Sequence, residues 1–321
     1  MPMGEFELIE RFFKRASRQA DVGIGDDCAL LSPRSGHQLA LSADMLVEGR
    51  HFLPTVNPCH LGHKSLAVNL SDLAACGASP RAFLLSLSLP RVDELWLAGF
   101  SKGLLDLADA HACDLIGGDT TQGPLNIAIT VVGDVPTGQA ILRSGARPLD
   151  DLYVSGNLGD ARLALEVFRG QLSLPQSVFD VARLRMETPT PRISLGLALR
   201  GVANAMADVS DGLLGDLGHI LTASGVGARL ELASMGALML THSAWDCPRD
   251  VLLRCMLSGG DDYELVFTAP PSVRTQVQAA ALATHTPVTR IGAITSDPGL
   301  VLISEDGFPL ANTFSSFEHF S

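Results

Sequence analysis

The N-terminal half of the chain alternates segments typical of strands with segments typical of helices. It opens on an amphipathic stretch with apolar residues at helical spacing, namely Phe6, Ile9, Phe12 and Phe13. Strands are expected at 28–31, 38–46, 82–90, 114–118 and 125–135. Helices are expected at 60–77 and at 93–112, the second of which opens with Asp93 and Glu94. This order predicts an α+β fold of mixed α/β layers, in which helices cover a sheet.

The pattern is interrupted near residues 136–156, where glycine, proline and charged residues precede a new strand-like segment. We therefore expect two domains, 1–137 and 138–321. The length of 321 residues agrees with this, because single cores rarely grow beyond roughly 250 to 300 residues. In the second half we expect helices near 159–169, 193–203, 213–223 and 271–284, one more helix ending near Leu257, and strands at 205–210, 228–232, 264–268, 288–294 and 299–303.

The net charge and the apolar pattern exclude several classes of partner. A formal net charge of -12 disfavours general binding to nucleic acid or anionic lipid, which depends on clustered Lys and Arg. No apolar run approaches the roughly 20 residues of a membrane helix, and the first twenty residues lack the pattern of a signal peptide. The six cysteines form no C-x-x-C pair and are expected to be reduced. We therefore expect a soluble cytoplasmic protein whose partners are small molecules and cations.

Lysine is nearly absent, and this excludes two large classes of phosphate-transferring enzymes. Of the 23 basic residues only Lys14, Lys64 and Lys102 are lysines. The chain has no G-x-x-x-x-G-K-[ST] segment and no V-A-I-K or H-R-D set, so neither a P-loop nor a protein-kinase site is encoded. It also lacks a G-x-S-x-G segment, and covalent catalysis is not indicated.

Aspartates recur in short segments of similar type, several of them beside glycine and at the ends of strand-like segments. They are Asp26, Asp27, Asp44, Asp72, Asp119, Asp208, Asp211, Asp216, Asp261 and Asp262. Two carboxylates about 4 Å apart repel by about 4 kcal/mol at an effective dielectric near 20, so converging carboxylates need cations. Oxygen ligands suit Mg²⁺ or Mn²⁺ better than zinc. Any one of these aspartates, taken alone, is more simply explained as a turn residue or a helix cap. Their repetition in both halves instead favours a metal-dependent phosphate enzyme.

Other residue types add less. The glycine pairs 117–118 and 259–260 would let backbone N–H groups approach an anion. His60 and His63 are explained by solvated or capping roles, whereas His51, just after the Asp44 strand, is a better candidate for touching substrate.

Eight segments occur in a recognisable order that runs nearly end to end. They are GEFELIERF, GIGDDCALL, LSADMLVEGRHF, KSLAVNLSDLAACGA, IGGDTTQGPL, RSGARP, ADVSDGLLGDLGHI and LSGGDDYEL. The series resembles the motifs of the thiamine-monophosphate kinase family. The resemblance implies the two-domain aminoimidazole ribonucleotide synthetase-like fold, and transfer of the ATP γ-phosphoryl group to thiamine monophosphate assisted by several Mg²⁺ ions per site. It also implies a homodimer whose N-terminal domains combine their strands in a shared barrel.

The same resemblance implies a role for individual residues. The metal ions would be surrounded by Asp27, Ser42, Ala43, Asp44, Asp72, Asp119, Asp208 and Asp211. ATP would be contacted by Gly118, Asp119, Arg143 and Ser210. The thiamine moiety would be contacted by His51, Asp261 and Phe317, and the catalytic set would be Asp44, Asp72, Asp211 and Arg143.

Three positions depart from the family's pattern. Ala43 stands where threonine is common, so a ligand there would be its backbone carbonyl. Asp261 replaces the usual glutamate, and Phe317 replaces tyrosine or tryptophan, which keeps stacking and loses the polar contact. A synthetase of the same superfamily with another acceptor, or a non-catalytic nucleotide- or metal-binding protein, stays open as an alternative.

Overall fold

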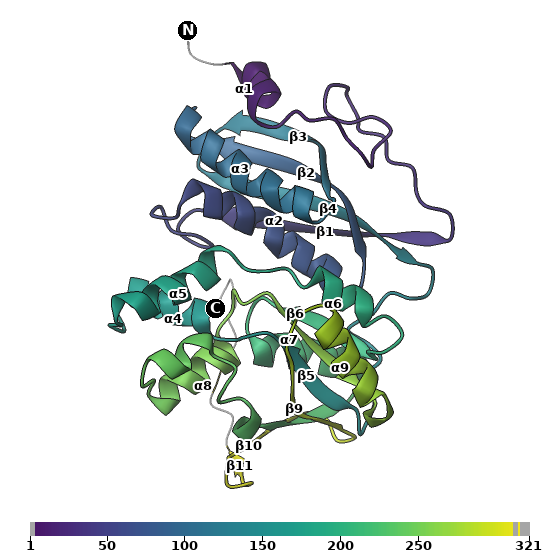
Figure 1. The fold of residues 1–321 in the computed structure, drawn as a ribbon, viewed down its shortest axis with the longest axis vertical. Helices are drawn as coiled ribbons and strands as arrows, with labels where there is room; N and C mark the ends of the chain where they lie inside the picture. The colour runs from purple at the N-terminus through teal and green to yellow at the C-terminus, as the bar shows by residue number, and fades with distance from the viewer. Residues whose placement is uncertain (1–3, 311–313, 315–321) are drawn as a thin grey trace. The chain divides into compact units, whose positions relative to one another are not determined.

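The structure is a computed structural model that describes residues 4–310 and residue 314. These residues divide into two compact units (Figure 1). The first comprises the described residues up to Leu73 together with Ala78–Gly138, and the second comprises Ala74–Gly77 and the described residues from Gln139 on.

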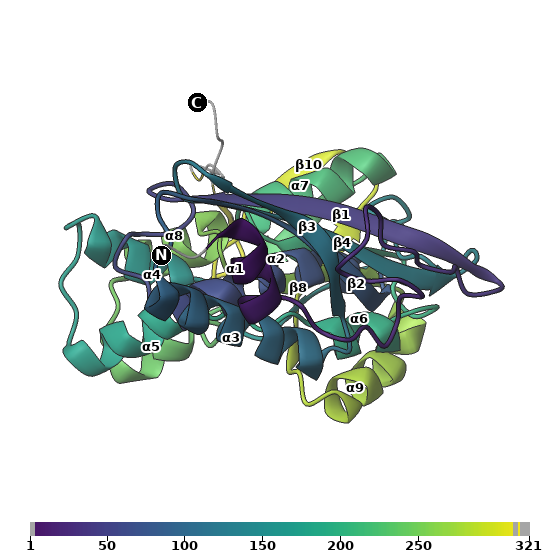
Figure 2. The ribbon, with the colours of Figure 1, turned by 90° about the horizontal axis from the view of Figure 1, so that it is seen from above.

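The first unit is a four-stranded sheet with helices on one face (Figures 1 and 2). Its elements are α1 (Glu5–Phe12), β1 (His37–Val47), α2 (Pro58–Ala75), β2 (Ser79–Leu89), α3 (Glu94–Ala110), β3 (Asp114–Gln122) and β4 (Asn126–Pro136). The strand order is β1-β4-β2-β3, in which β4 is antiparallel to both neighbours and β2 is parallel to β3. The helices bury one face of the sheet, while side chains such as Leu41 of β1 and Leu84 of β2 are exposed on the other face.

Local chemistry sets the start of α3 and its contact with α2. Asp93 caps α3, because its side chain accepts hydrogen bonds from the N–H groups of Leu95 and Trp96, both at 3.1 Å. The two helices touch through glycine: a Cβ on Gly103 would lie 1.8 Å from the carbonyl oxygen of Cys59. Only glycine permits this approach of two helix backbones.

The second unit contains a seven-stranded sheet of order β11-β10-β7-β9-β5-β8-β6. Its strands are β5 (Asp151–Ser155), β6 (Ala205–Val209), β7 (Gly227–Glu231), β8 (Glu264–Ala269), β9 (Val288–Thr295), β10 (Gly299–Ile303) and β11 (Pro309–Leu310). Its helices are α4 (Asp160–Phe168), α5 (Gln176–Glu187), α6 (Ile193–Ala198), α7 (Leu213–Ser224), α8 (Arg249–Ser258) and α9 (Arg274–Ala283). Strands β5, β6 and β8 are buried along their whole length and form the centre of the core.

The structure corrects two expectations about secondary structure. The strand expected at 28–31 does not form; the segment makes only an isolated bridge between Val22 and Leu30 and belongs to an exposed arch. Helix α5 (Gln176–Glu187) was not expected. Its many polar residues obscure the helical spacing of the apolar side chains that pack against α4. Within the described residues, no helix combines the length and the apolar character that crossing a membrane requires.

Candidate functional site

Strand β1 and helix α2 together position two of the aspartates. The Ser42 hydroxyl donates a hydrogen bond to the carboxylate of Asp72, and the backbone N–H of Asp44 donates one to Asn69 Oδ1 at 3.1 Å. Both aspartates are half-buried. Since side chains alternate along a strand, Ser42 and Asp44 share one face of β1 and Ala43 lies on the other, where its side chain is exposed. The chain therefore offers oxygen atoms from two elements on one side of the sheet.

His51 follows β1 and is held in one orientation. Its Nδ1 accepts a hydrogen bond from the backbone N–H of Val47 at 3.0 Å, and Lys64 Nζ lies 3.4 Å from its carbonyl oxygen. A ring nitrogen that accepts a hydrogen bond carries no proton, so the neutral imidazole bears its proton on Nε2.

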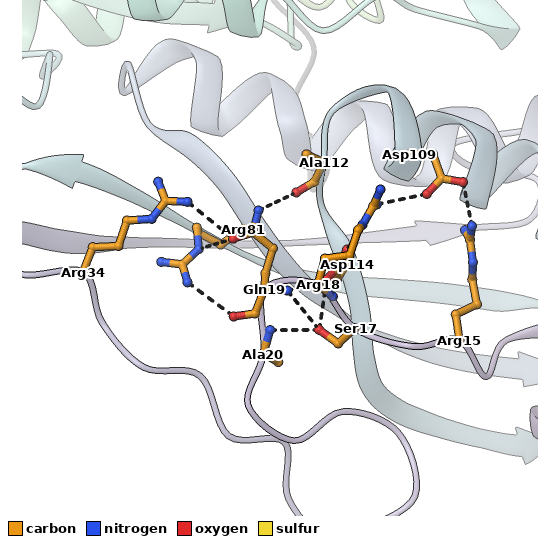
Figure 3. Close-up of polar contacts among 10 residues, drawn as sticks. All are labelled: Arg15, Ser17, Arg18, Gln19, Ala20, Arg34, Arg81, Asp109, Ala112 and Asp114. Carbon is orange, nitrogen blue, oxygen red and sulfur yellow. Dashed lines mark hydrogen bonds and ion pairs between the residues drawn. The ribbon is translucent and has the colours of Figure 1, made fainter.

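The GIGDD segment lies in the exposed arch of residues 21–30. Asp27 is exposed, and its backbone N–H donates to Asp26 Oδ1 at 2.8 Å. The preceding residues are fastened to β3, since Asp114 accepts hydrogen bonds from Ser17 Oγ at 2.9 Å, from Gln19 N at 2.7 Å and from the N–H of Arg18 (Figure 3). The segment that leads into the arch is therefore held in place by β3.

Asp114, which holds this segment, is charged. Burial alone would raise the pKa of its carboxyl group, but the hydrogen bonds from Arg18, Ser17 and Gln19 outweigh burial and lower that pKa. Gln19 is held in turn, because its Oε1 accepts from Arg81 Nε at 2.9 Å (Figure 3).

Gly118 and Asp119 lie on β3, beside β2. A Cβ on Gly118 would lie 1.8 Å from the carbonyl oxygen of Leu85, and its φ of 144° is one that side chains disfavour. The glycine is therefore required by strand pairing, whatever else approaches it. Asp119 is exposed and is paired with Ser86 in the register.

In the second unit, the loop after β6 carries Ser210 and Asp211. Asp216 holds this loop through hydrogen bonds. The Asp216 carboxylate accepts hydrogen bonds from Ser210 N at 3.0 Å and from Asp211 N at 3.1 Å. Burial raises the pKa of Asp216 to about 7, and the charge of Asp211 acts in the same direction. Asp208 lies on β6 itself and is buried.

The loop before β8 is joined to the loop after β6. The N–H groups of Asp261 and Tyr263 donate to the carbonyl oxygens of Ser210 and Val209, both at 2.8 Å. Asp261 and Tyr263 have φ values of 70° and 51°, left-handed conformations that cost a side-chain-bearing residue about 1 to 2 kcal/mol each. A Cβ on Gly260 would lie 2.3 Å from the carbonyl oxygen of Ser210. The glycine pair 259–260 is therefore explained by close backbone packing.

Arg143 is exposed on the segment that leads into the second unit. The segment is attached to the end of α7, because Ser224 Oγ accepts from Gly145 N and Ala146 N, each at 3.1 Å, and donates to the Arg143 carbonyl oxygen at 3.2 Å. Phe317 lies outside the described residues.

Asp216 and Asp262 differ from the exposed and half-buried aspartates of the sequence pattern. Both are buried and accept backbone hydrogen bonds, and burial also raises the pKa of Asp262. Sequence reasoning did not recognise their supporting role, because they share the glycine-rich surroundings of the exposed aspartates. The only local signal is the position of Asp216 inside the first turn of α7.

The donor atoms of the candidate site suit a hard cation. Among residues 4–310 and residue 314, no three His, Cys, Asp or Glu side chains lie close enough together to hold a metal ion. A magnesium site does not need three, because Mg²⁺ is usually held by one or two carboxylates together with substrate phosphates. The half-buried oxygen donors Ser42, Asp44 and Asp72 fit that pattern.

Known proteins resemble this chain over both units. Residues 25–135 match the family domain described as AIR synthase related protein, N-terminal domain, and residues 150–305 match the C-terminal domain of the same family. The chain is 45% identical over 327 residues to thiamine-monophosphate kinase of Escherichia coli (strain K12), covering 100% of this chain and 99% of that protein.

Two solved structures extend the comparison to the fold. The crystal structure of thiamine-monophosphate kinase from Stenotrophomonas maltophilia K279a has a TM-score of 0.85 at 43% identity and covers 97% of this chain and 99% of that one. AaThiL complexed with AMPPCP and TMP has a TM-score of 0.77 at 28% identity, with coverage of 90% and 89%. The similarity thus extends through both units, and one of these relatives holds an ATP analogue together with TMP.

Proposed function

The chain belongs to the thiamine-monophosphate kinase family, and from this premise we propose that it transfers the γ-phosphoryl group of ATP to the phosphate of thiamine monophosphate, yielding thiamine diphosphate and ADP. The observation that carries the proposal is the full-length match of 45% identity to a thiamine-monophosphate kinase. The relative that binds AMPPCP and TMP together supports the same pair of substrates.

We assign the nucleotide and metal roles to the loops and strands that carry oxygen donors. Asp44, Asp72 and Asp211 would act in catalysis with Arg143. The metal ions would lie near the oxygen atoms of Asp27, Ser42, Ala43, Asp44, Asp72, Asp119, Asp208 and Asp211. ATP would be contacted by Gly118, Asp119, Arg143 and Ser210. When bound there, Mg²⁺ would neutralise charge on the phosphate oxygens.

The protein's own groups would orient the reactants. The hydroxyl of Ser42 holds the Asp72 carboxylate, and Asn69 holds the backbone beside Asp44. The acceptor phosphate needs no general base, because a phosphate monoester with a second pKa near 6 is already ionised at pH 7. What the reaction requires is in-line positioning and charge neutralisation.

The thiamine moiety would be recognised by His51, Asp261 and Phe317. The Nε2–H of His51 supplies a donor, since Nδ1 is occupied by Val47. The carboxylate of Asp261 supplies an acceptor and a negative charge that suits the positively charged thiazolium ring.

We assign the first domain, 1–137, to ATP and metal binding and to dimerisation, and the second, 138–321, to completing the active site. A homodimer in which the N-terminal strands share a barrel is supported by large apolar side chains exposed on one face of the first sheet, namely Leu39, Leu41, Met45 and Leu84. Leu84 and Ala43 both pair with Thr130, so these side chains share one face of the sheet. Replacing Leu41 and Met45 with glutamate should shift the protein toward monomers in sedimentation velocity.

We also place the enzyme in the cytoplasm, where ATP is supplied. The decisive test of function is incubation of the purified protein with ATP, Mg²⁺ and thiamine monophosphate, followed by chromatography of thiamine diphosphate and ADP. Equal amounts of the two products are expected. Release of ADP without thiamine diphosphate would refute the acceptor.

The same assay tests the metal-binding aspartates. Asp44→Asn and Asp72→Asn should each lower kcat by about 100-fold or more, because each removes a charge that neutralises the phosphates. Asp106→Asn, on the exposed face of α3, is the matched control and should keep the parent rate. Parent rates in both site variants would contradict the assignment.

A further inference from the structure

We propose that Asp262 is a positioning residue: held inside the second unit, it aims the neighbouring carboxylate of Asp261 at the thiamine moiety of the acceptor. The inference rests on the proposed function, because it concerns how the residue assigned to the acceptor is presented.

Asp262 is anchored at the beginning of a helix. Its side chain is 3% exposed, and its two carboxylate oxygens lie 3.0 and 2.9 Å from the backbone nitrogen of Gly159. Gly159 is the residue that precedes α4, where the backbone N–H groups lack partners within the helix and need acceptors. The side chain of Asp262 is therefore turned into the second unit and tied to a rigid element.

Glu264, two residues further on, provides a second anchor. Arg192 binds both of its carboxylate oxygens, through Nε and Nη2 at 2.6 Å each, and Arg185 Nη2 lies 3.0 Å away. Ser155 Oγ donates to the same carboxylate at 2.7 Å. Such a two-pronged arginine contact fixes direction as well as distance, so β8 begins at a defined point.

The backbone between these anchors is in a conformation that it would not adopt alone. Asp261 and Tyr263 are both left-handed, and neither is glycine. A backbone of this kind persists only where the surrounding structure holds it. Asp262 lies between the two, so its bond to Gly159 acts together with the N–H bonds of Asp261 and Tyr263 to hold both left-handed residues in place.

The result is that two successive aspartates have different environments. Asp262 is buried, whereas Asp261 is half-buried, with its N–H bonded to Ser210 at 2.8 Å. Without the anchor, only the bonds to Ser210 and Val209 would oppose relaxation of residues 261 and 263 toward the conformations that L residues prefer, and the carboxylate of Asp261 would be directed less precisely.

Asp262 could instead serve only the stability of the second unit, and Asp160 provides the matched control for that reading. Asp160 is 1% exposed and begins the same helix, where it accepts from Leu240 N at 2.8 Å, from Thr241 N at 3.0 Å and from Thr241 Oγ1 at 2.7 Å. These hydrogen bonds run to residues 240 and 241, so we expect its loss to destabilise the unit without removing the bond between Asp262 and Gly159.

The experiment measures KM for thiamine monophosphate and KM for ATP separately, together with the melting temperature, in the full-length protein. In Asp262→Ala we expect KM for thiamine monophosphate to rise by about tenfold or more, since small misplacements of a binding group are costly. KM for ATP should change by less than about twofold, because the loop that carries Ser210 keeps its own hydrogen bonds to Asp216 when the Asp262 anchor is lost. Asp160→Ala should melt earlier and leave both KM values within about twofold of the parent.

Two further variants test whether the effect passes through Asp261. Asp262→Asn keeps an oxygen acceptor for Gly159 N–H, so it should return KM for thiamine monophosphate to within about threefold of the parent. The double variant Asp261→Ala, Asp262→Ala should have the same KM as Asp261→Ala alone, because a positioning residue has nothing left to position.

The inference is overturned if Asp262→Ala keeps the parent KM for thiamine monophosphate, if Asp160→Ala raises it equally, or if the effects of the double variant add. Should Asp262→Ala not fold, Asp262→Ser, which is too short to reach Gly159, carries the same expectations. Failure of the parent protein to phosphorylate thiamine monophosphate would refute the proposed function instead, so the two failures are distinguishable.

Discussion

Replacing Asp216 with asparagine should change how the stability of the second unit depends on pH. The carboxyl group of Asp216 has a pKa of about 7 in the folded protein against an ordinary value of 3.8, chiefly because burial disfavours its charged form. A group whose pKa is raised by folding contributes stability that is complete below about pH 3.8. That contribution is lost as the pH rises to about 7.

The magnitude follows from the two pKa values. Each pKa unit corresponds to about 1.4 kcal/mol, so ionising Asp216 costs the folded state roughly 4 kcal/mol between pH 4 and pH 7. Asparagine cannot ionise, and its oxygen can still accept the N–H groups of Ser210 and Asp211. The variant should therefore gain stability over the parent as the pH rises, by up to about 4 kcal/mol.

Urea unfolding without divalent cations, at pH values from 4 to 8, measures this difference. The chain has two tryptophans, so in a Trp96→Phe background the fluorescence of Trp245 reports the second unit, against whose core it packs. Asp297→Asn, at an exposed position, controls for the loss of one negative charge. Unfolding free energies of Asp216→Asn and parent that run parallel across this range would refute the argument.

Three other perturbations test the structure. Gly103→Ala should destabilise the first unit by about 1 to 3 kcal/mol, because the added methyl group meets the Cys59 carbonyl. Gly218→Ala should instead stabilise α7 by about 0.5 to 1 kcal/mol, because its methyl group meets nothing within 4 Å. Thermal unfolding of both variants checks that the two effects have opposite signs. Asp93→Ala should cost about 1 kcal/mol through loss of the α3 cap, measured by urea unfolding. Asp114→Asn should hasten proteolysis of residues 15–36 at neutral pH, and since folding lowers the pKa of Asp114, the parent should lose this advantage as the pH falls below about 4.

Helices and strands with strong local signals were predicted from the sequence. The strand expected at 38–46 is His37–Val47, and the helix expected to open at Asp93 begins directly after it. Alternation and capping act between near neighbours in the chain, so the sequence carries them in full. Helix α5 (Gln176–Glu187) escaped prediction because contact with α4, made only in the folded chain, decides it.

The candidate site was predicted in part. Its aspartates and the family were recognised from ordered motifs, and the family is confirmed over the whole chain. The different environments of the individual aspartates could not be recognised from the sequence. Asp261 and Asp262 are adjacent and identical in type, yet Asp261 is half-buried and Asp262 is buried.

The sequence by itself determined most of the elements, the two-domain α/β character, the lack of a P-loop or protein-kinase motif, and the family. Only the tertiary structure decided which carboxylates support the loops instead of facing outward. Asp262 is bonded to Gly159, 103 residues away in the chain, and Glu264 to Arg192, 72 residues away. Desolvation and hydrogen bonding depend on such distant partners, and their effect on a carboxylate exists only once the chain is folded.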